Sequence, residues 1–366
     1  MTISVADAVA AVDYDHFVIE PDGTRLAQSS SIASIQQMLH DLDVRPGDRV
    51  LEIGTGSGYT TALLAHLVGA GVGAGGTVRS VEVFADLVPR ARARLTAAGV
   101  TGVTVTEGDG YAGDPAGAPY DRVVAWAAPH VVPSAWIDQI IESAVIVAPV
   151  KVAPLAAANA IAAVTVTGGR PTAVRARRGG YIEMHPEPVT VFGLPLRYVD
   201  ASYVAADGAV PDDTGVSANT EVPDDTEVLG NTEPWWLSSP GLRAVPGAAG
   251  RVLERLRDAS VASATSLTEA ESHDDFTAWL LATLPEGLAT AGLSARFSAI
   301  GAVVDDGAAL LTRDELVAAG NADALRTLDT WIVRWREAGR PGWSDVGAVV
   351  VPTVEGWEVR LTLQEA

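Results

Sequence analysis

A glycine-rich segment near residue 54 constrains the fold of this chain more than any other feature. Residues 50–67 read VLEIGTGSGYTTALLAHL, where an apolar, β-branched run ends at Gly54 and a helical pattern starts at Tyr59. Short apolar runs that end at glycine are typical of buried strands, and leucines repeated on one face are typical of helices. A strand, a glycine turn and a helix in direct succession form the opening unit of a doubly wound α/β sheet.

Strand-like and helix-like segments continue to alternate through residue 150. We expect strands at 50–54, 77–83, 103–109, 120–129 and 144–150, and further strands at 160–167 and 189–199. We expect helices at 35–42, 59–68, 84–98 and 134–141. Alternation at this spacing is the signature of a mostly parallel sheet. The sequence therefore predicts a doubly wound α/β domain over residues 1–200.

The composition changes after residue 200. Residues 205–233 contain eight acids, no bases and a duplicated VPDDT. This composition predicts a solvated linker or long loop, with a docking motif as the alternative. Residues 234–366 regain an apolar pattern, with helices expected at 247–259, 274–284 and 322–337, a strand pair at 295–304 and a strand at 356–363. They predict a smaller, accessory α+β domain, for which peptide recognition is the expected role.

The charge and the residue types exclude several classes of partner and site. The formal net charge is −21, and residues 201–366 carry 26 acids against 11 bases, which argues against nucleic acid and anionic membrane as partners. A chain without cysteine has no disulfides, zinc–thiolate sites or thiol nucleophiles. No histidine pair has the spacing of metal ligands, so no metal is expected. No secretory signal or membrane span is evident, which predicts a cytoplasmic protein whose oligomeric state stays open.

The spacing of the glycines narrows the ligand expected over the loop. Gly54, Gly56 and Gly58 follow the pattern G-x-G-x-G, whereas the dinucleotide fingerprint is G-x-G-x-x-G. Glu52 lies two residues before the first glycine. Its carboxylate would repel a pyrophosphate but attract an ammonium, such as that of the amino acid end of S-adenosylmethionine. The pattern favours S-adenosylmethionine as the cofactor and leaves a nicotinamide dinucleotide as the alternative.

Two more acids follow the next two expected strands. Glu82 lies at the end of the second strand, where a carboxylate can accept both ribose hydroxyls of a nucleoside. Asp109 ends the third strand, where it can accept the adenine amino group. A single acid at a strand end is usually only solvated. Three acids at successive strand ends, together with the glycine loop, predict a cofactor site.

Four stretches also carry a family resemblance. They are QSSS at 28–31, RVLEIGTGSGYTTALLAHL, EGDGY and VVAWAAPHVVPSAWIDQI. Together they resemble the protein-L-isoaspartate O-methyltransferase family over residues 15–195. The resemblance implies a Rossmann-like class I methyltransferase fold, S-adenosylmethionine as cofactor, and Ser30 as the active-site serine. It also implies cofactor contacts from Glu52, Gly54, Thr55, Gly56 and Gly58 on the loop, and from Glu82, Asp109 and Gly110 at the ribose and adenine.

The chain departs from this family's pattern in several places. Ile32 stands where the family has proline, Trp126 where it has a small or hydroxylated residue, and Ser143-Ala144 where it has two glycines. The segment after residue 195 has no counterpart in the compact repair enzymes. These departures resemble longer relatives that esterify an aspartate in a ribosomally made, modified precursor peptide, whose ester then closes to an aspartimide. Repair of isoaspartyl residues and non-catalytic peptide binding stay open as alternatives.

Methyl transfer to a carboxylate needs no general base, because an aspartate with a pKa of about 4 is already ionised at neutral pH. A serine hydroxyl suits the remaining task, since it can donate a hydrogen bond to one carboxylate oxygen and so align the other. Ser30 has an alternative role as the N-cap of the helix that follows, for which Ser29 and Ser31 compete. Ser31 and Trp126 are the expected substrate contacts, with ordinary packing as the alternative for Trp126.

Overall fold

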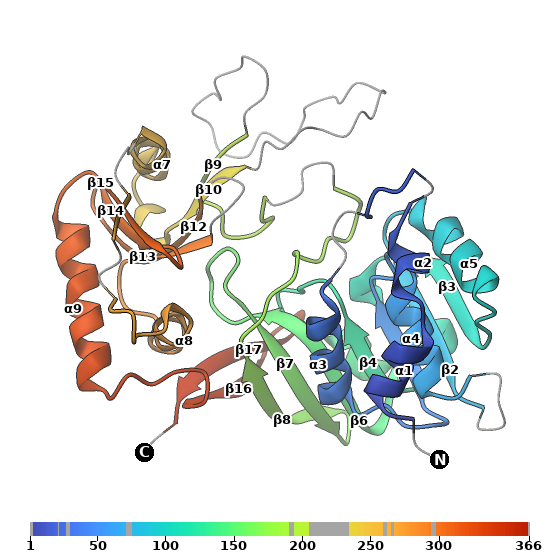
Figure 1. Cartoon of the computed structure of the whole chain (residues 1–366). Helices are drawn as coiled ribbons and strands as arrows, with labels where there is room; N and C mark the ends of the chain where they lie inside the picture. The colour runs from blue at the N-terminus through green and yellow to red at the C-terminus, as the bar shows by residue number, and fades with distance from the viewer. Residues whose placement is uncertain are drawn as a thin grey trace. The chain divides into compact units, whose positions relative to one another are not determined.

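The computed structural model describes residues 3–20, 22–26, 30–70, 75–189, 194–204, 234–258, 262–264, 267–293 and 298–364. The chain divides into two compact units, which are described separately (Figure 1). The first unit comprises Met1–Lys151, Asn159–Val189 and Ala348–Arg360, and the second comprises Val152–Ala158, Thr190–Gly347 and Leu361–Ala366. The acidic segment expected at 205–233 lies outside the described residues.

The first unit contains a seven-stranded sheet in the order β3-β2-β1-β4-β6-β7-β8. Its strands are β1 (Arg49–Ile53), β2 (Thr77–Glu82), β3 (Val103–Glu107), β4 (Tyr120–Ala125), β6 (Ile140–Lys151), β7 (Asn159–Thr167) and β8 (Arg170–Arg177). Strands β3, β2, β1, β4 and β6 run parallel, and β7 and β8 are antiparallel additions. The doubly wound sheet predicted from the sequence is therefore confirmed, and its order reverses between β1 and β4, where such sheets bind ligands.

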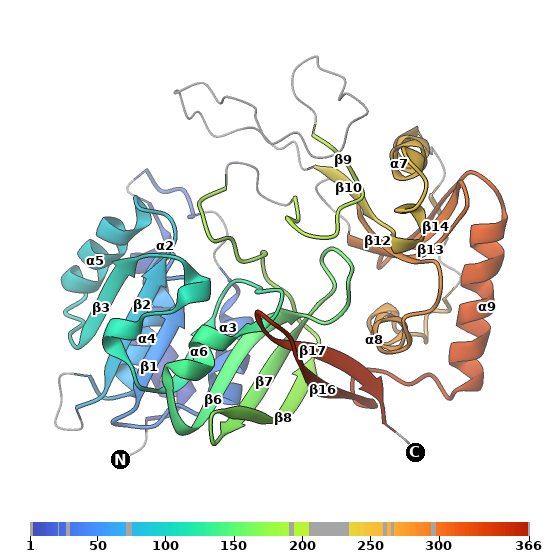
Figure 2. The ribbon, with the colours of Figure 1, turned by 180° about the vertical axis from the view of Figure 1, so that it is seen from behind.

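Helices cover both faces of this sheet. They are α1 (Val5–Ala11), α2 (Tyr14–Val18), α3 (Ile32–Leu42), α4 (Tyr59–Leu67), α5 (Leu87–Ala97) and α6 (Ser134–Asp138), with short 3-10 turns η1 (Gly110–Ala112) and η2 (Pro115–Gly117). Helix α3 contacts β4, β6 and β7, and α4 contacts β2, on the face seen in Figure 1. Figure 2 shows α6 on the opposite face. Every residue of α4 except His66 is buried, which places this helix in the core of the unit.

The end of the sheet differs from the sequence-based expectation. Its last strand is β8, which forms a hairpin with β7, whereas the described residues of the expected strand at 189–199 form no strand. Pro195 within this range disfavours a strand, since proline lacks the N–H that a sheet ladder requires. The alternating pattern of RPTAVRAR suits a half-exposed edge strand instead.

A short second sheet brings the end of the chain into the first unit. It has the order β16-β17-β5, formed by β16 (Val346–Pro352), β17 (Gly356–Leu363) and β5 (Val132–Pro133). Gly356 and Trp357 pair with Pro133 and Val132. Residues 348–360 therefore group with the first unit, whereas the domain boundaries expected from the sequence assigned them to the second domain.

The second unit is an antiparallel sheet with helices on both faces. Its order is β11-β15-β14-β13-β12-β10-β9. The strands are β9 (Ala201–Tyr203), β10 (Trp235–Ser238), β11 (Ala262–Ala264), β12 (Leu288–Gly292), β13 (Ser298–Val304), β14 (Gly307–Leu311) and β15 (Glu315–Ala319). Helix α7 (Ala248–Asp258) packs on β9, β10 and β15, while α9 (Asp323–Glu337) packs on β13 and β14 beside α8 (His273–Thr283). The three expected helices and a sheet-rich α+β unit are observed, but the strand pair expected at 295–304 is the single strand β13 among the described residues.

Glu271 provides a pH-dependent support for this second unit. Its side chain is buried and accepts hydrogen bonds from Arg336 and Arg340, and the Arg336 guanidinium holds the pKa of Glu271 well below its usual range. A lowered carboxyl pKa contributes stability above the unfolded value of about 4.3, and that stability is lost as the pH falls through the folded value. We therefore expect the wild type to lose more free energy of unfolding than Glu271→Gln when the pH falls below about 4.3. Denaturant titrations of both proteins at several pH values measure this, and parallel pH profiles would contradict it.

Candidate functional site

The glycine loop after β1 has a backbone that other residues adopt only with strain. Gly54, Gly56 and Gly58 have φ of 90°, 52° and 88°, in the left-handed region that favours glycine. A Cβ on Gly56 would meet nothing within 4 Å, whereas one on Gly58 would touch Leu95 and Ala91. The loop therefore packs against α5 on one side and leaves open space above Gly56 on the other. A ligand can approach its backbone there.

Glu82 lies beside this open space, at the end of β2. Its side chain is buried, with the residue only 5% exposed, and its Oε2 accepts a hydrogen bond of 2.8 Å from the backbone N–H of Gly56. Its Oε1 accepts one of 3.1 Å from the N–H of Phe84. A carboxylate has about four acceptor positions, so further positions remain for the two hydroxyls of a ribose. The acid and the loop expected to bind the cofactor are thus brought together.

Glu52 has a different role from the one expected. Its side chain is fully buried and accepts four hydrogen bonds, from Thr60 (2.6 Å), Thr61 (2.5 Å), Ser80 (2.7 Å) and the Trp126 indole (2.9 Å). Burial raises the pKa of Glu52, against the opposite effect of these four donors. Because the four acceptor positions are all used within the protein, Glu52 supports the glycine loop from below. This arrangement argues against the direct ammonium contact that the sequence suggested.

The side chain of Thr55, like that of Glu52, points into the protein core. Its hydroxyl lies 2.6 Å from the Ser80 hydroxyl, which itself donates to Glu52. The Ser80 hydroxyl therefore accepts a hydrogen bond from the Thr55 hydroxyl, and the Thr55 side chain is part of the core. Any contact between Thr55 and a ligand over the loop has to come from its backbone.

Asp109 and Gly110 lie at the end of β3, as expected from the sequence. The Asp109 carboxylate accepts from the N–H of Tyr111 (2.9 Å) and so caps the η1 turn. A Cβ on Gly110 would lie 2.6 Å from the Ile53 side chain, and the Gly110 carbonyl accepts from the Trp136 indole (2.8 Å). The turn is therefore packed closely across the end of β1, where only glycine fits.

Ser30 and Ser31 divide the two roles that the sequence left open. Ser31 is the N-cap of α3, and its hydroxyl accepts from the Ser34 N–H at 3.3 Å and donates to the Ser34 hydroxyl at 2.9 Å. The capping alternative for Ser30 is thus taken by its neighbour. The carbonyl of Ser30 accepts from the Tyr14 hydroxyl (3.3 Å), which fixes its backbone. Gln28 and Ser29 lie outside the described residues.

Trp126 joins the glycine loop to Tyr181, a residue that the sequence analysis missed. Trp126 is buried, its indole N–H bonds Glu52, and its Cβ would lie 3.6 Å from a Cβ on Gly54. Its ring centroid lies 6.1 Å from that of Tyr181. Trp126 therefore takes the packing role that the sequence left open, and its expected contact with the substrate stays a prediction. Tyr181 carries no local motif, so the sequence offered no signal for it.

A second group missed by the sequence analysis connects three distant segments. The Tyr111 hydroxyl lies 3.1 Å from Nδ1 of His130 and 3.3 Å from the Met184 carbonyl, and Nε2 of His130 lies 2.5 Å from the Glu355 carboxylate. Tyr111 follows β3, His130 follows β4, and Glu355 comes from the turn before β17. The group ties the final hairpin of the chain to the edge of the sheet where parallel strands end.

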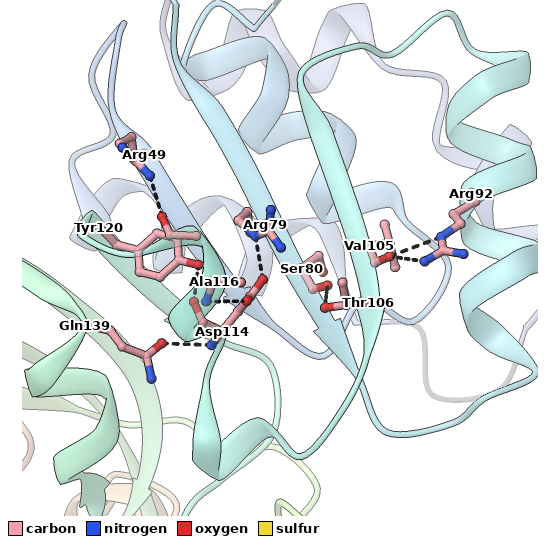
Figure 3. Close-up of polar contacts among 11 residues, drawn as sticks. Arg49, Arg79, Ser80, Arg92, Val105, Thr106, Asp114, Ala116, Tyr120 and Gln139 are labelled. Carbon is pink, nitrogen blue, oxygen red and sulfur yellow. Dashed lines mark hydrogen bonds and ion pairs between the residues drawn. The ribbon is translucent and has the colours of Figure 1, made fainter.

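A separate polar network lies at the opposite, amino-terminal end of β1 and β4 (Figure 3). Asp114 pairs with Arg79 (2.5 Å), its N–H donates to Gln139 (2.8 Å), and its carbonyl accepts from the Tyr120 hydroxyl (2.6 Å). Burial raises the pKa of Tyr120 to about 12. Each of these groups bonds to another part of the protein, so the network is structural.

Neither a metal centre nor a membrane-spanning helix is found in the described part of the chain. No group of three or more His, Asp or Glu side chains there could hold a metal ion. Within the same residues, no helix is long and apolar enough to cross a bilayer.

Comparison with known proteins gives a family match in the first half of the chain. Residues 2–163 match the family model described as Protein-L-isoaspartate(D-aspartate) O-methyltransferase (PCMT). The chain is 49% identical to the protein-L-isoaspartate O-methyltransferase of Methanoculleus marisnigri over 113 residues, which are 31% of this chain and 48% of that protein. It is 42% identical to the same-named protein of Ignicoccus hospitalis over 120 residues, 33% of this chain and 55% of the relative. The chain thus spans about half the length of the curated relatives it matches.

A solved structure of a protein-L-isoaspartate O-methyltransferase also aligns with this chain. The alignment covers 97% of this chain and 93% of that one, at 16% identity and a TM-score of 0.46.

Proposed function

We propose that this protein transfers the methyl group of S-adenosylmethionine to the side-chain carboxylate of an aspartyl or isoaspartyl residue in a peptide or protein. The observation that carries the proposal is the open glycine loop beside Glu82, which lies inside the segment that matches the PCMT family. Ser30, Asp109 and Trp126 lie in the same segment. The curated relatives that the chain matches are named protein-L-isoaspartate O-methyltransferases, which supports a carboxyl acceptor.

The residues present fit S-adenosylmethionine. The loop offers backbone and open space above Gly56, Glu82 offers free acceptor positions for ribose hydroxyls, and Asp109 and Gly110 flank the end of β3 where adenine would lie. The cofactor would supply a methyl group already activated on a sulfonium. Glu52 and Thr55 act indirectly, because their side chains hold the loop in shape.

In this reaction the protein's residues align the acceptor carboxylate with the methyl group. An acceptor carboxylate is ionised at neutral pH, so no general base is required. Holding two reactants in line can lower a barrier by roughly 7–11 kcal/mol. The hydroxyl of Ser30, which is free of the capping role, would donate to one carboxylate oxygen and direct the other toward the methyl group.

The proposal has two forms, which differ in the peptide that carries the acceptor carboxylate. Most of the second unit, from residue 190 onward, lies beyond the matched segment, which favours a dedicated substrate: an aspartate in a ribosomally made, modified precursor peptide, whose ester closes to an aspartimide. The names of the matched relatives favour the second form, methylation of isoaspartyl residues for repair. In either form the partner is a peptide chain rather than nucleic acid, consistent with the net charge of −21.

Mass spectrometry of reactions with S-adenosylmethionine separates these forms. The acceptors are an isoaspartyl peptide, the aspartyl peptide of the same sequence, and modified precursor peptides encoded beside this protein. A gain of one CH₂ followed by net loss of one water on a precursor peptide alone supports the dedicated form. Ester on the generic isoaspartyl peptide supports repair. A protein that binds peptide but makes no ester with any acceptor would be a binding module, and the proposal would be rejected.

Ser30→Ala and Ser31→Ala form a matched pair for testing the role of the serine. Ser30→Ala is expected to lower kcat/KM for the acceptor by about 10- to 100-fold, the size of a hydrogen bond to a charged group, with unchanged cofactor affinity. Ser31→Ala removes the α3 cap and is expected to cost about 1 kcal/mol of stability while kcat/KM changes little. Steady-state kinetics and thermal unfolding measure both. If Ser31→Ala lowers kcat/KM and Ser30→Ala lowers only the stability, then Ser31 and not Ser30 contacts the acceptor.

A further inference from the structure

The hydroxyl of Tyr181 is a buried polar group without an evident structural task. The oxygen is shielded from solvent, and apart from the neighbouring Ser30 side chain no described residue offers it a hydrogen-bond partner. Most buried polar atoms in native proteins have a partner, because leaving one unpaired costs free energy. An exception beside a ligand site therefore requires an explanation.

The backbone around Tyr181 is held firmly at the edge of the site. Ala128, which follows β4, donates its N–H to the Ile182 carbonyl (2.7 Å) and accepts from the Met184 N–H (2.9 Å) at its own carbonyl. These bonds form a short parallel bridge between residues 128 and 183. The backbone directly after Tyr181 is thus fixed by two hydrogen bonds to residue 128.

Two residues of the candidate site, Trp126 and Ser30, surround the hydroxyl. The Tyr181 ring lies against Trp126, which packs on Gly54 of the glycine loop. The Ser30 side chain lies beside the hydroxyl and lowers its pKa, but burial is the larger effect and raises the pKa of Tyr181 overall. A tyrosine with a raised pKa stays protonated at neutral pH and keeps its hydrogen to donate.

We propose that the Tyr181 hydroxyl is a second hydrogen-bond donor to the acceptor carboxylate, beside Ser30. This inference rests on the proposed function and adds a substrate-binding residue to it. The bound carboxylate would supply the acceptor that the buried hydroxyl lacks. Two neutral hydroxyls also suit the reaction, because an adjacent guanidinium or ammonium would pair with the carboxylate and reduce its nucleophilicity.

The step balances without proton transfer. A carboxylate oxygen forms the new bond to the methyl carbon while the carbon–sulfur bond breaks and its electron pair stays on sulfur. The negative carboxylate and the positive sulfonium become a neutral ester and a neutral thioether. Tyr181 and Ser30 keep their hydrogens throughout, and their hold on the acceptor weakens when its charge is lost, which helps the product to leave.

The test compares Tyr181→Phe with Tyr120→Phe in the full-length protein, using isoaspartyl and aspartyl peptides at saturating S-adenosylmethionine. Tyr181→Phe is expected to raise KM for the acceptor by about 10- to 100-fold. Its affinity for S-adenosylhomocysteine should not change, and its Tm should stay equal or rise, since an unpaired buried hydroxyl is removed. Tyr120→Phe loses the bond to the Asp114 carbonyl, so its Tm should fall while its kinetics are kept.

The outcomes separate this inference from the function on which it rests. If Tyr181→Phe forms ester with the KM of the wild type, the role of Tyr181 is overturned and the proposed function stands. If its affinity for S-adenosylhomocysteine falls by the same factor as kcat/KM, the effect is general and the specific role is again overturned. If the wild type esterifies no acceptor, the function itself fails and this role fails with it. A Ser30→Ala/Tyr181→Phe double variant should show coupled, non-additive losses, because both hydroxyls would hold one carboxylate.

Discussion

Glu82→Ala is expected to weaken binding of S-adenosylmethionine and S-adenosylhomocysteine by about 100-fold or more while the protein stays folded. Two hydrogen bonds from ribose hydroxyls to a charged acceptor are worth about 1.5–3 kcal/mol each. The substitution also releases the Gly56 N–H, which Glu82 holds at 2.8 Å, so the loop loses part of its preorganised shape. Isothermal titration calorimetry with S-adenosylhomocysteine measures the loss directly, without any need for an acceptor.

Glu107 offers a matched control for this experiment. It ends the adjacent strand β3, is paired in register with Glu82, and is exposed. Glu107→Ala removes the same charge from the same edge of the sheet but no buried hydrogen bonds, so affinity should change by less than about threefold, as expected for a screened surface charge. Equal losses in the two variants would mean that general charge, and not a contact from Glu82, holds the cofactor. Unchanged affinity in Glu82→Ala would remove Glu82 from the site.

Local patterns predicted the part of the fold that surrounds the glycine loop. Strand β1 and helix α4 lie within one residue of the expected 50–54 and 59–68, because an apolar run, a glycine turn and an apolar helix leave few alternatives. The pairing of β17 with β5 joins residues more than two hundred positions apart, so no local pattern reports it. The described residues of the expected strand at 189–199 form no strand, and Pro195 among them lacks the N–H that a sheet ladder requires.

The candidate site shows the same contrast between residues that local sequence patterns predict and residues that only tertiary contacts bring together. The sequence pointed to Glu82 and Gly56, which the structure brings into contact. It could not show that four donors surround Glu52, because those donors come from α4, β2 and the segment after β4. Tyr181 lies between Trp126 and Ser30 only through the bridge formed at residue 128. Short motifs thus predict the loop that we propose binds the cofactor, whereas the residues that shape its surroundings depend on tertiary contacts.

Glu52→Ala is expected to destabilise the first unit by about 3 kcal/mol or more at neutral pH, because four buried donors lose their acceptor together. Since burial raises the pKa of Glu52, the wild type's advantage is greatest below the unfolded value of about 4.3 and declines as the pH rises through the folded value. Denaturant unfolding of both proteins at two pH values measures the size and the sign of this dependence.

Glu52→Gln tests whether the carboxylate acts through its shape or through its charge. The amide oxygen can accept from the Trp126 indole, which cannot turn its donor away, and from Thr60. The amide NH₂ then faces two hydroxyls, those of Thr61 and Ser80, which can rotate to accept. We therefore expect Glu52→Gln to keep most of the stability and most of the affinity for S-adenosylhomocysteine. If Glu52→Gln folds normally but binds no cofactor, the charge of Glu52 acts on the ligand, and the direct contact first expected from the sequence is restored.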